Sequence, residues 1–258
     1  MEKRTDGFLI NKGEHEKDFI FGTRAVIEAI NAQKDIDKIL VDKEVNNELV
    51  KELLKLAKQE RIPVVRVPDG KLNRITRKNH QGVIAHMSSI QYASLDNVIE
   101  ECYSKGVAPM ILVLDRITDV RNFGAIARTA DCAGVHAVVI PEKGSAQINS
   151  DAVKTSAGAL NHLPVVRVKN LYYTVKDLKK MGLNIVSVSE KTERLMYEAD
   201  FTLPTALILG SEEDGISQEL MGISDEFVKI PMAGNIESLN VSVSAAVVIY
   251  EGIRQRRA

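Results

Sequence analysis

The sequence predicts an α/β protein with two domains, a small N-terminal α/β unit and a C-terminal domain built on a parallel sheet. Six short runs after residue 109 are rich in Ile, Val and Leu, which is the pattern of strands buried on both faces. Helical patterns separate these runs, as connections between parallel strands require. Before residue 90, shorter strands alternate with amphipathic helices, and a chain of 258 residues has room for both domains.

The N-terminal domain is expected over residues 19–90, after a polar stretch, 1–18, whose lack of hydrophobic periodicity predicts a flexible tail. Leu49, Leu53 and Leu56 recur at helical spacing and give the longest predicted helix of this domain one apolar stripe. The predicted elements are a helix over 23–31, a strand over 37–41, a helix over 46–60, a strand over 62–67, a basic helix near 70–78 and a strand over 82–88.

The C-terminal domain is expected over residues 109–258, after a linker, 91–108, that contains one helix. Its strands are predicted over 110–114, 137–140, 165–168, 184–188, 206–209 and 227–230. Parallel α/β sheets bind ligands outside the carboxyl ends of their strands. The unusual residues of this domain follow predicted strands, so a functional site is expected at that edge.

Composition and charge exclude several classes of protein. No apolar run reaches the roughly 20 residues of a membrane helix, and the N-terminus is neither a secretory signal nor an Arg-rich transit peptide. Cys102 and Cys132 lie far apart, which argues against a disulfide framework or a zinc cluster. We therefore expect a cytoplasmic protein that binds no metal and no membrane.

A basic cluster between residues 61 and 78 suggests contact with nucleic acid, although the net charge of -1 gives no such signal. Only Asp69 opposes it, and such a cluster suits a phosphate backbone. An ordinary solvated face is the alternative. His80 belongs either to this surface or to the packing of the domain. The candidate RNA-binding residues are Arg61, Arg66, Lys71, Arg74, Arg77 and Lys78.

The first motif of the C-terminal domain, LDRITDVRNFGAIARTA over 114–130, joins a strand to a helix expected to begin near residue 123. Asn122 stands near the N-cap, where its amide can satisfy unpaired backbone N–H groups. Gly124 permits close approach of a ligand or another backbone. Arg128 is long enough to reach back toward the strand ends. A plain helix cap and a surface arginine are the alternatives for Asn122 and Arg128.

The second motif, LILGSEEDGIS over 207–217, is a strand that runs into a glycine-rich turn. Gly210 and Gly215 are spaced as in a P-loop, but Ile216 stands where lysine must follow, so a phosphate cradle is excluded. The chain also lacks G-x-G-x-x-G, which disfavours a nucleotide-dependent oxidoreductase. What remains is a turn that directs the carboxylate of Glu212 into the crevice, or a purely structural turn.

The third motif, IPMAGNIESLNVSVSAAV over 230–247, is a strand end, a loop and a helix rich in small residues. The strand ends at Ile230-Pro231-Met232, and Gly234 lies in the loop. Ser238 precedes the helix, and its alternative role is that of a helix cap.

In this order the motifs N-x-G-A-I-x-R-T-A, L-G-x-E-x-x-G and I-P-M…S-L-N-V-S resemble those of the SpoU (TrmH) family of RNA 2′-O-methyltransferases, over about residues 109–258. FGTRAVIEAI and HQGVIA resemble that family's substrate-binding domain. The two-domain form is most similar to the bacterial members that methylate a guanosine ribose in 23S ribosomal RNA. Val120 departs from the family, in which many members have proline.

The resemblance implies that the C-terminal domain is tied in a deep trefoil knot, an exception to the rule against knots, and that members form homodimers with the site near the subunit interface. It implies S-adenosylmethionine as cofactor, held mainly by the backbone of Gly210, Ile230 and Leu239 and by the loop with Met232 and Gly234.

The resemblance also implies the roles of the polar residues. Arg128 positions a substrate phosphate, and either Arg128 or that phosphate accepts the hydroxyl proton, since a guanidinium is normally charged. Asn122, Glu212, Ser238 and Asn240 hold Arg128, the ribose and the loops in register. A transfer-RNA methyltransferase and a non-catalytic RNA-binding factor for ribosome assembly are the alternatives.

Overall fold

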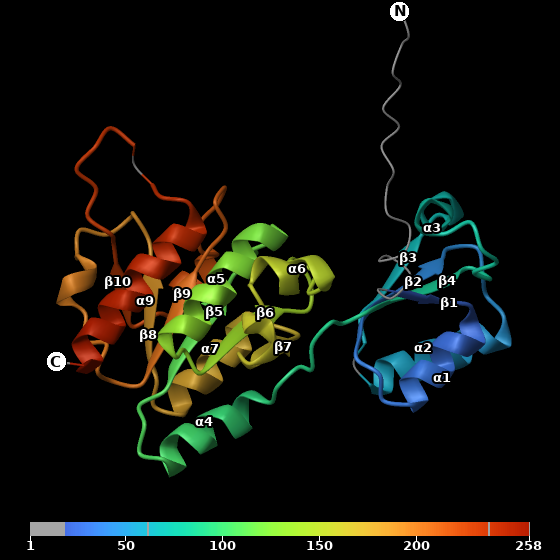
Figure 1. The fold of residues 1–258 in the computed structure, drawn as a ribbon, viewed down its shortest axis with the longest axis horizontal. Helices are drawn as coiled ribbons and strands as arrows, with labels where there is room; N and C mark the ends of the chain where they lie inside the picture. Colours follow the sequence, from blue (N-terminus) through green and yellow to red (C-terminus); the bar gives the residue numbers. More distant parts are fainter. Residues whose placement is uncertain (1–18, 61, 237, 258) are drawn as a thin grey trace, which may run out of the picture. The chain divides into compact units, whose positions relative to one another are not determined.

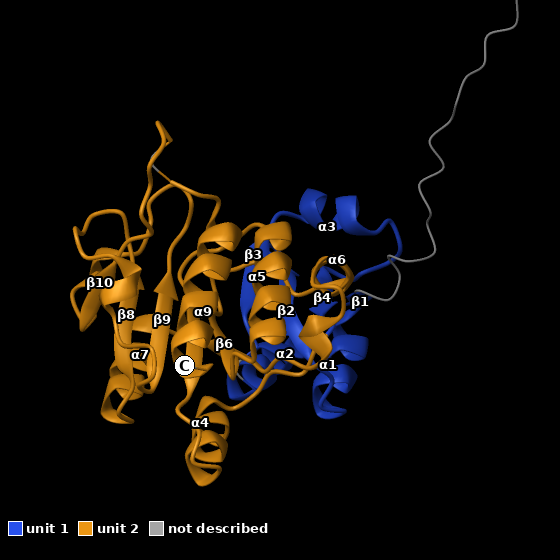
Figure 2. Cartoon of the chain, turned by 60° about the vertical axis from the view of Figure 1, so that its left-hand side comes forward, with its two compact units in different colours: residues 1–89 blue, residues 90–258 orange. Residues whose placement is uncertain are grey.

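The computed structural model describes residues 19–60, 62–236 and 238–257, and the predicted tail, 1–18, lies outside these ranges. The chain divides between Ser89 and Ile90 into two compact units, each with its own sheet (Figure 2). This boundary assigns residues 91–108, which we expected to be a linker, to the second unit. No helix in the described ranges has the length and apolar character needed to cross a membrane.

The first unit contains a four-stranded mixed sheet in the order β1-β4-β2-β3. Strands β2 and β3 are parallel, whereas β4 is antiparallel to both of its neighbours. The short edge strand β1 was not predicted as a strand, because three residues are too few for a visible alternation. The strands are β1 (Phe19–Phe21), β2 (Ile36–Asp42), β3 (Val64–Val67) and β4 (Val83–Met87).

Three helices cover this sheet. The helices α1 (Thr23–Asn31) and α2 (Glu48–Gln59) share one apolar core with the strands, and α3 (Asp69–Ile75) packs Leu72 into a second, smaller one. The predicted basic helix ends at Ile75 rather than at residue 78, because the next residue, Thr76, is already extended with φ −147° and ψ 141°. Arg77 and Lys78 therefore lie beyond the helix.

The second unit contains a six-stranded sheet in the order β10-β8-β9-β5-β6-β7, and every neighbouring pair is parallel. All six predicted strands are confirmed. The last one ends at Val228 rather than at residue 230, because β8, the strand with which it pairs, also ends at this level. The strands are β5 (Met110–Leu114), β6 (Ala137–Pro141), β7 (Val165–Val168), β8 (Asn184–Val188), β9 (Thr205–Leu209) and β10 (Glu226–Val228).

Helices cover both faces of this sheet (Figure 1). Successive side chains of β5 enter two separate cores, with Leu112 in one and Val113 in the other. The first core contains side chains of α5 (Val120–Ala133), α6 (Ser150–Thr155) and α9 (Val241–Arg257). The second contains side chains of α4 (Leu95–Ser104), α7 (Leu171–Lys180) and α8 (Gln218–Met221). Because Ile99 of α4 is only 3% exposed in that core, α4 is part of the domain rather than of a linker.

The starts of α5 and α9 differ from the predictions. The carboxylate of Asp119 accepts the backbone N–H groups of Arg121 and Asn122, so α5 begins at Val120 and Asn122 is not its cap. At α9, the side-chain oxygen of Asn240 accepts the backbone N–H of Ser242 at 3.0 Å. Ser238 therefore lies in the preceding loop and is not the helix cap. The side chains of Asn122 and Ser238 are therefore not used as helix caps.

Candidate active site

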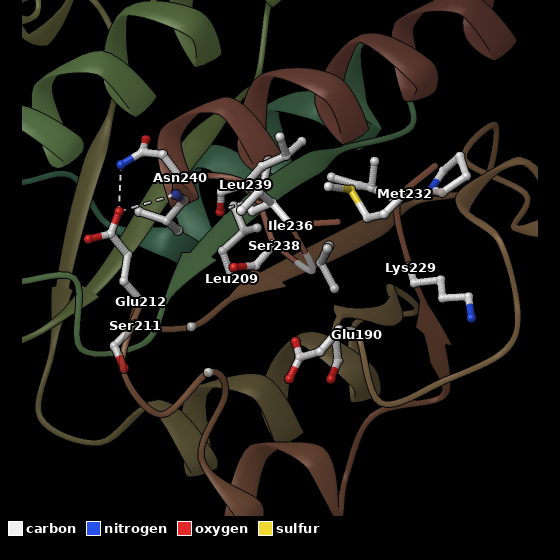
Figure 3. Close-up of a pocket in the computed structure, with 18 of the residues that line it drawn as sticks. Glu190, Leu209, Ser211, Glu212, Lys229, Met232, Ile236, Ser238, Leu239 and Asn240 are labelled. Carbon is white, nitrogen blue, oxygen red and sulfur yellow. Dashed lines mark hydrogen bonds between the residues drawn. The ribbon is translucent and has the colours of Figure 1, made fainter. Parts of the chain in front are cut away.

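A cavity of about 700 Å³ opens at the carboxyl ends of β8 and β9 and beside the loop between β10 and α9 (Figure 3). This is the sheet edge at which the sequence predicted a site. Its volume lies in the usual range for small-molecule pockets, roughly 300 to 1,000 Å³. The lining residues are Val188, Ser189, Glu190, Leu195, Leu209, Gly210, Ser211, Glu212, Gly215, Lys229, Ile230, Pro231, Met232, Gly234, Ile236, Ser238, Leu239, Asn240, Val241 and Ser244.

All five residues proposed as cofactor contacts line this cavity: Gly210, Ile230, Met232, Gly234 and Leu239. Three of the lining side chains combine large apolar surfaces with high exposure, namely Ile236 at 73%, Met232 at 39% and Leu239 at 37%. Exposed apolar surface around a hollow is typical of a ligand site. The cavity is thus suited to a ligand with a broad apolar or aromatic part.

The glycine turn forms one wall of the cavity. A Cβ atom on Gly210 would lie 2.0 Å from the carbonyl carbon of Gly215, so no other residue fits there without moving the turn. The turn is closed by two backbone hydrogen bonds between Ser211 and Gly215, of 3.1 and 3.0 Å. Gly215 has φ +68°, a conformation that favours glycine. Both glycines are therefore required by the turn itself.

A polar network joins the three sequence motifs. The side-chain amide of Asn240 donates to Asn122 Oδ1 at 3.1 Å and to Glu212 Oε1 at 2.5 Å. The same carboxylate oxygen accepts the backbone N–H of Val241 at 3.5 Å, and Figure 3 shows Glu212 and Asn240 pointing toward each other at the cavity wall. The network connects the first turn of α5, the turn after β9 and the start of α9.

A second hollow, of about 260 Å³, adjoins the first and shares Ser211, Glu212 and Val241 with it. Asn122 lines this second hollow, together with Arg116, Ile117, Thr118, Asp119, Glu213 and Asp214. The network of Asn122, Glu212 and Asn240 therefore lies where the two hollows meet. A ligand bound in the first hollow therefore lies beside a second hollow, whose walls carry amide and carboxylate groups.

Two candidate catalytic residues stand apart from this network. Ser238 lines the large cavity and forms no hydrogen bond with another described residue. Arg128 lines neither hollow; its side chain is exposed and forms no hydrogen bond or ion pair within the described ranges. It lies six positions after Asn122 along α5, a rotation of roughly 240° about the helix axis. Within one chain, the structure does not bring Arg128 to the network.

Sequence reasoning missed part of the cavity wall. Ser189 and Glu190 follow β8, and Lys229 follows β10. The ends of predicted strands were the available signal, since ligands of parallel sheets meet that edge. In the described ranges, no three His, Cys, Asp or Glu side chains lie close enough together to hold a metal ion.

The basic cluster of the first unit separates into different kinds of residue. Lys71, Arg74, Arg77 and Lys78 are exposed, whereas Arg61 lies outside the described residues. The guanidinium of Arg66 donates to the backbone carbonyls of Asp42 and Val45, at 2.6 and 2.8 Å, so the unit itself engages it. The surface that faces solvent is therefore smaller than predicted.

His80 belongs to the packing of the first unit rather than to its basic surface. It is buried, and its Nδ1 accepts the backbone N–H of Gly82 at 3.0 Å. This hydrogen bond stabilises the turn that leads into β4, in which Gly82 has φ +76°.

Comparison with protein families identifies relatives of both units. Residues 109–250 match the SpoU rRNA Methylase family, and residues 19–93 match the family described as RNA 2′-O ribose methyltransferase substrate binding. A protein of Bacillus subtilis (strain 168), named putative TrmH family tRNA/rRNA methyltransferase YacO, is 34% identical over 241 residues, which is 93% of this chain and 97% of that protein.

Two solved structures are also similar. The SpoU methyltransferase AviRb from Streptomyces viridochromogenes, in complex with the cofactor AdoMet, is 27% identical with a TM-score of 0.58 and covers 96% of this chain and 95% of its own. The A. aeolicus TrmH/SpoU tRNA modifying enzyme is 31% identical with a TM-score of 0.54, covering 62% of this chain and 85% of its own.

Proposed function

The chain belongs to the SpoU rRNA methylase family and is an RNA 2′-O-ribose methyltransferase that uses S-adenosylmethionine, and we propose that its acceptor is a guanosine ribose of 23S ribosomal RNA. The second and third motifs line one cavity of about 700 Å³, and Asn240 at its wall joins them to Asn122 of the first motif; this convergence carries the assignment of the site. Ribosomal RNA is favoured because the family that residues 109–250 match is described as SpoU rRNA Methylase. A transfer-RNA acceptor is the second candidate, because a similar structure is named a tRNA modifying enzyme.

The cavity suits S-adenosylmethionine by its size and by its apolar lining. We assign the adenosine to the backbone of Gly210, Ile230 and Leu239, with Met232 and Gly234 closing over it from the loop. When bound, this cofactor supplies a methyl group that its sulfonium already activates. The remaining task of the protein is to align a ribose 2′-oxygen with that methyl group and to dispose of the hydroxyl proton.

We assign the alignment of the ribose to the network of Asn122, Glu212 and Asn240. It lies where the cofactor cavity meets the smaller hollow, so a ribose held there faces the large cavity. The hydroxyl of Ser238, in the wall of the large cavity, has no hydrogen-bond partner among the described residues and adds to this alignment. The network is already hydrogen-bonded in the protein alone, which limits the reorganisation needed when substrate arrives.

We assign to Arg128 the positioning of a substrate phosphate, with Arg128 or that phosphate as proton acceptor. Because Arg128 is exposed and lies on a different side of α5 from Asn122, we propose that it acts at the site of a second chain and that the protein acts as a homodimer. Val243 and Tyr250 of α9 are 46% and 50% exposed, and they offer apolar surface for that interface. The substrate-binding surface of the first unit consists of Lys71, Arg74, Arg77 and Lys78.

A trefoil knot in the C-terminal domain, which the family resemblance implies, stays a prediction. A catalytically inactive RNA-binding factor is the remaining alternative, and the intact network at the cavity speaks against it.

A direct test incubates the protein with methyl-labelled S-adenosylmethionine and, separately, with 23S ribosomal RNA and total transfer RNA lacking the modification. We expect label in the ribosomal RNA only. Label in transfer RNA alone would reassign the substrate and leave the reaction in place. Binding of the cofactor without transfer to either RNA would support the inactive RNA-binding factor.

A further inference from the structure

Arg116, two residues after the end of β5, has a backbone conformation that arginine rarely adopts. Its φ is +60°, in the left-handed region, where glycine alone is free of a steric cost. Gln33, Gln81 and Ala157 share this property among the described residues, but Arg116 is the one of the four that lines either hollow of the site. Strained residues that a structure retains at a ligand site often have a role there.

The guanidinium of Arg116 bridges two segments that are far apart in sequence. Nη1 donates to Asp214 Oδ2 and Nη2 donates to the carbonyl oxygen of Gly215, both at 2.9 Å. Nε lies 3.4 Å from a carboxylate oxygen of Asp115. One side chain thus connects the end of β5 with the glycine turn after β9.

A second connection runs beside it. Asp115 is buried, with an exposed fraction of 5%, and its Oδ2 accepts the backbone N–H of Ser217 at 2.7 Å. Asp115 therefore holds the residue just after the turn, while Arg116 holds Asp214 and Gly215 within it. The two consecutive residues fix the turn from one side.

The position of this turn determines two features of the site. Gly215 packs against Gly210 so closely that a Cβ atom on Gly210 would overlap it, and both glycines line the cofactor cavity. Glu212, which accepts from Asn240, belongs to the same turn. A shift of the turn would move the cavity wall and the network together.

We propose that Arg116 is a positioning residue for methyl transfer, which holds the Ser211–Gly215 turn in the conformation that binds the cofactor and presents Glu212. This inference rests on the proposed function of the cavity. An arginine serves here because its planar guanidinium bonds two acceptors at once, whereas lysine is a point charge. The strained backbone conformation of Arg116 is retained because it places the guanidinium within hydrogen-bonding distance of the turn.

Arg116→Gly separates this role from a merely structural one. Glycine relieves the left-handed backbone, which offsets the hydrogen bonds lost with the guanidinium, so we expect the melting temperature to stay close to that of the wild type. The bridge is lost, so we expect the Kd for S-adenosylmethionine, measured by calorimetry without RNA, to rise about tenfold. A purely structural residue would change stability and affinity in the same direction.

Three variants complete the design. Arg116→Met keeps the length without the charge and should match Arg116→Gly in affinity, whereas Arg116→Lys should recover part of the loss. Arg121→Met changes an exposed arginine of the same segment, one that lines neither hollow, and should bind as the wild type does. Asp214→Asn, which leaves residue 116 intact, should raise the Kd about threefold, because the bond to Gly215 remains.

Wild-type affinity in Arg116→Gly and Arg116→Met would overturn the inference, and wild-type affinity in Asp214→Asn would do so if neither arginine variant folds. Absence of cofactor binding by the wild-type protein would instead contradict the proposed function.

Discussion

The side-chain amide of Asn240, at the start of α9, donates a hydrogen bond of 3.1 Å to Asn122 Oδ1 in the first turn of α5, 118 residues earlier in the chain. The same nitrogen reaches Glu212 in the turn after β9. Three motifs that are separate in the sequence thus converge on one amide group. This convergence, at the junction of two hollows, gives the individual residues distinct and testable roles.

Asn122→Ala removes the partner of Asn240 on α5 without opening the fold, because Asp119 rather than Asn122 caps this helix. We expect the rate of methyl transfer at saturating cofactor to fall about 100-fold through loss of ribose alignment. The Kd for S-adenosylmethionine should change less than about twofold, since Asn122 does not line the large cavity. Arg121→Ala, one residue away, is the control, and a wild-type rate in Asn122→Ala would remove Asn122 from the site.

Arg128→Ala should reduce the rate of methyl transfer by about 100-fold or more, the usual effect of a group that positions or moves a proton. Its melting temperature should equal that of the wild type, because Arg128 has no hydrogen-bond or ion-pair partner among the described residues. Thermal denaturation and initial rates measure the two effects. Full turnover of the variant would show that Arg128 has no part in the reaction.

Gly210→Ala should abolish cofactor binding and lower the melting temperature, because the new Cβ would meet the backbone of Gly215 at 2.0 Å. Gly70→Ala is the matched control: a Cβ there has no atom within 4 Å, and alanine favours the helix α3. Calorimetry and thermal denaturation of both variants test the prediction. Normal cofactor affinity in Gly210→Ala would contradict a tight turn at this wall.

The basic residues of the first unit should divide into two groups. Simultaneous replacement of Lys71, Arg74 and Arg77 by alanine should weaken RNA binding and reduce the slope of log K against log salt by about two, if these side chains contact phosphates. Arg66→Met should instead lower the melting temperature, because the carbonyls of Asp42 and Val45 lose their donor. An unchanged salt slope in the triple variant would contradict an RNA-facing surface here.

Much of the second unit could be predicted because its strands are buried on both faces and its motifs follow their carboxyl ends. The six strands follow from that pattern, whereas the lining of the cavity by Gly210, Ile230 and Leu239 was expected from the resemblance to the SpoU family. Which of two nearby residues caps a helix was harder to predict. Asp119 and Asn122 are both good helix caps, and Asp119, three residues earlier, is the one that caps α5.

Contacts across long stretches of chain were beyond prediction. Arg116 bonds Gly215, which is 99 residues away, and nothing local distinguishes it from a surface arginine. Arg66 belongs to a basic run in the sequence, yet it donates to carbonyls that only the folded sheet brings near. The packing of α4 against the sheet likewise depends on the finished core rather than on its own amphipathic pattern.

One measurement tests the reaction most directly: the RNA labelled from S-adenosylmethionine is digested to nucleosides, and the labelled nucleoside is identified by mass spectrometry. We expect the label in a 2′-O-methylated nucleoside, guanosine from 23S ribosomal RNA, and its loss in Asn122→Ala. Label on a nucleobase rather than on the ribose would contradict the reaction assigned to this site.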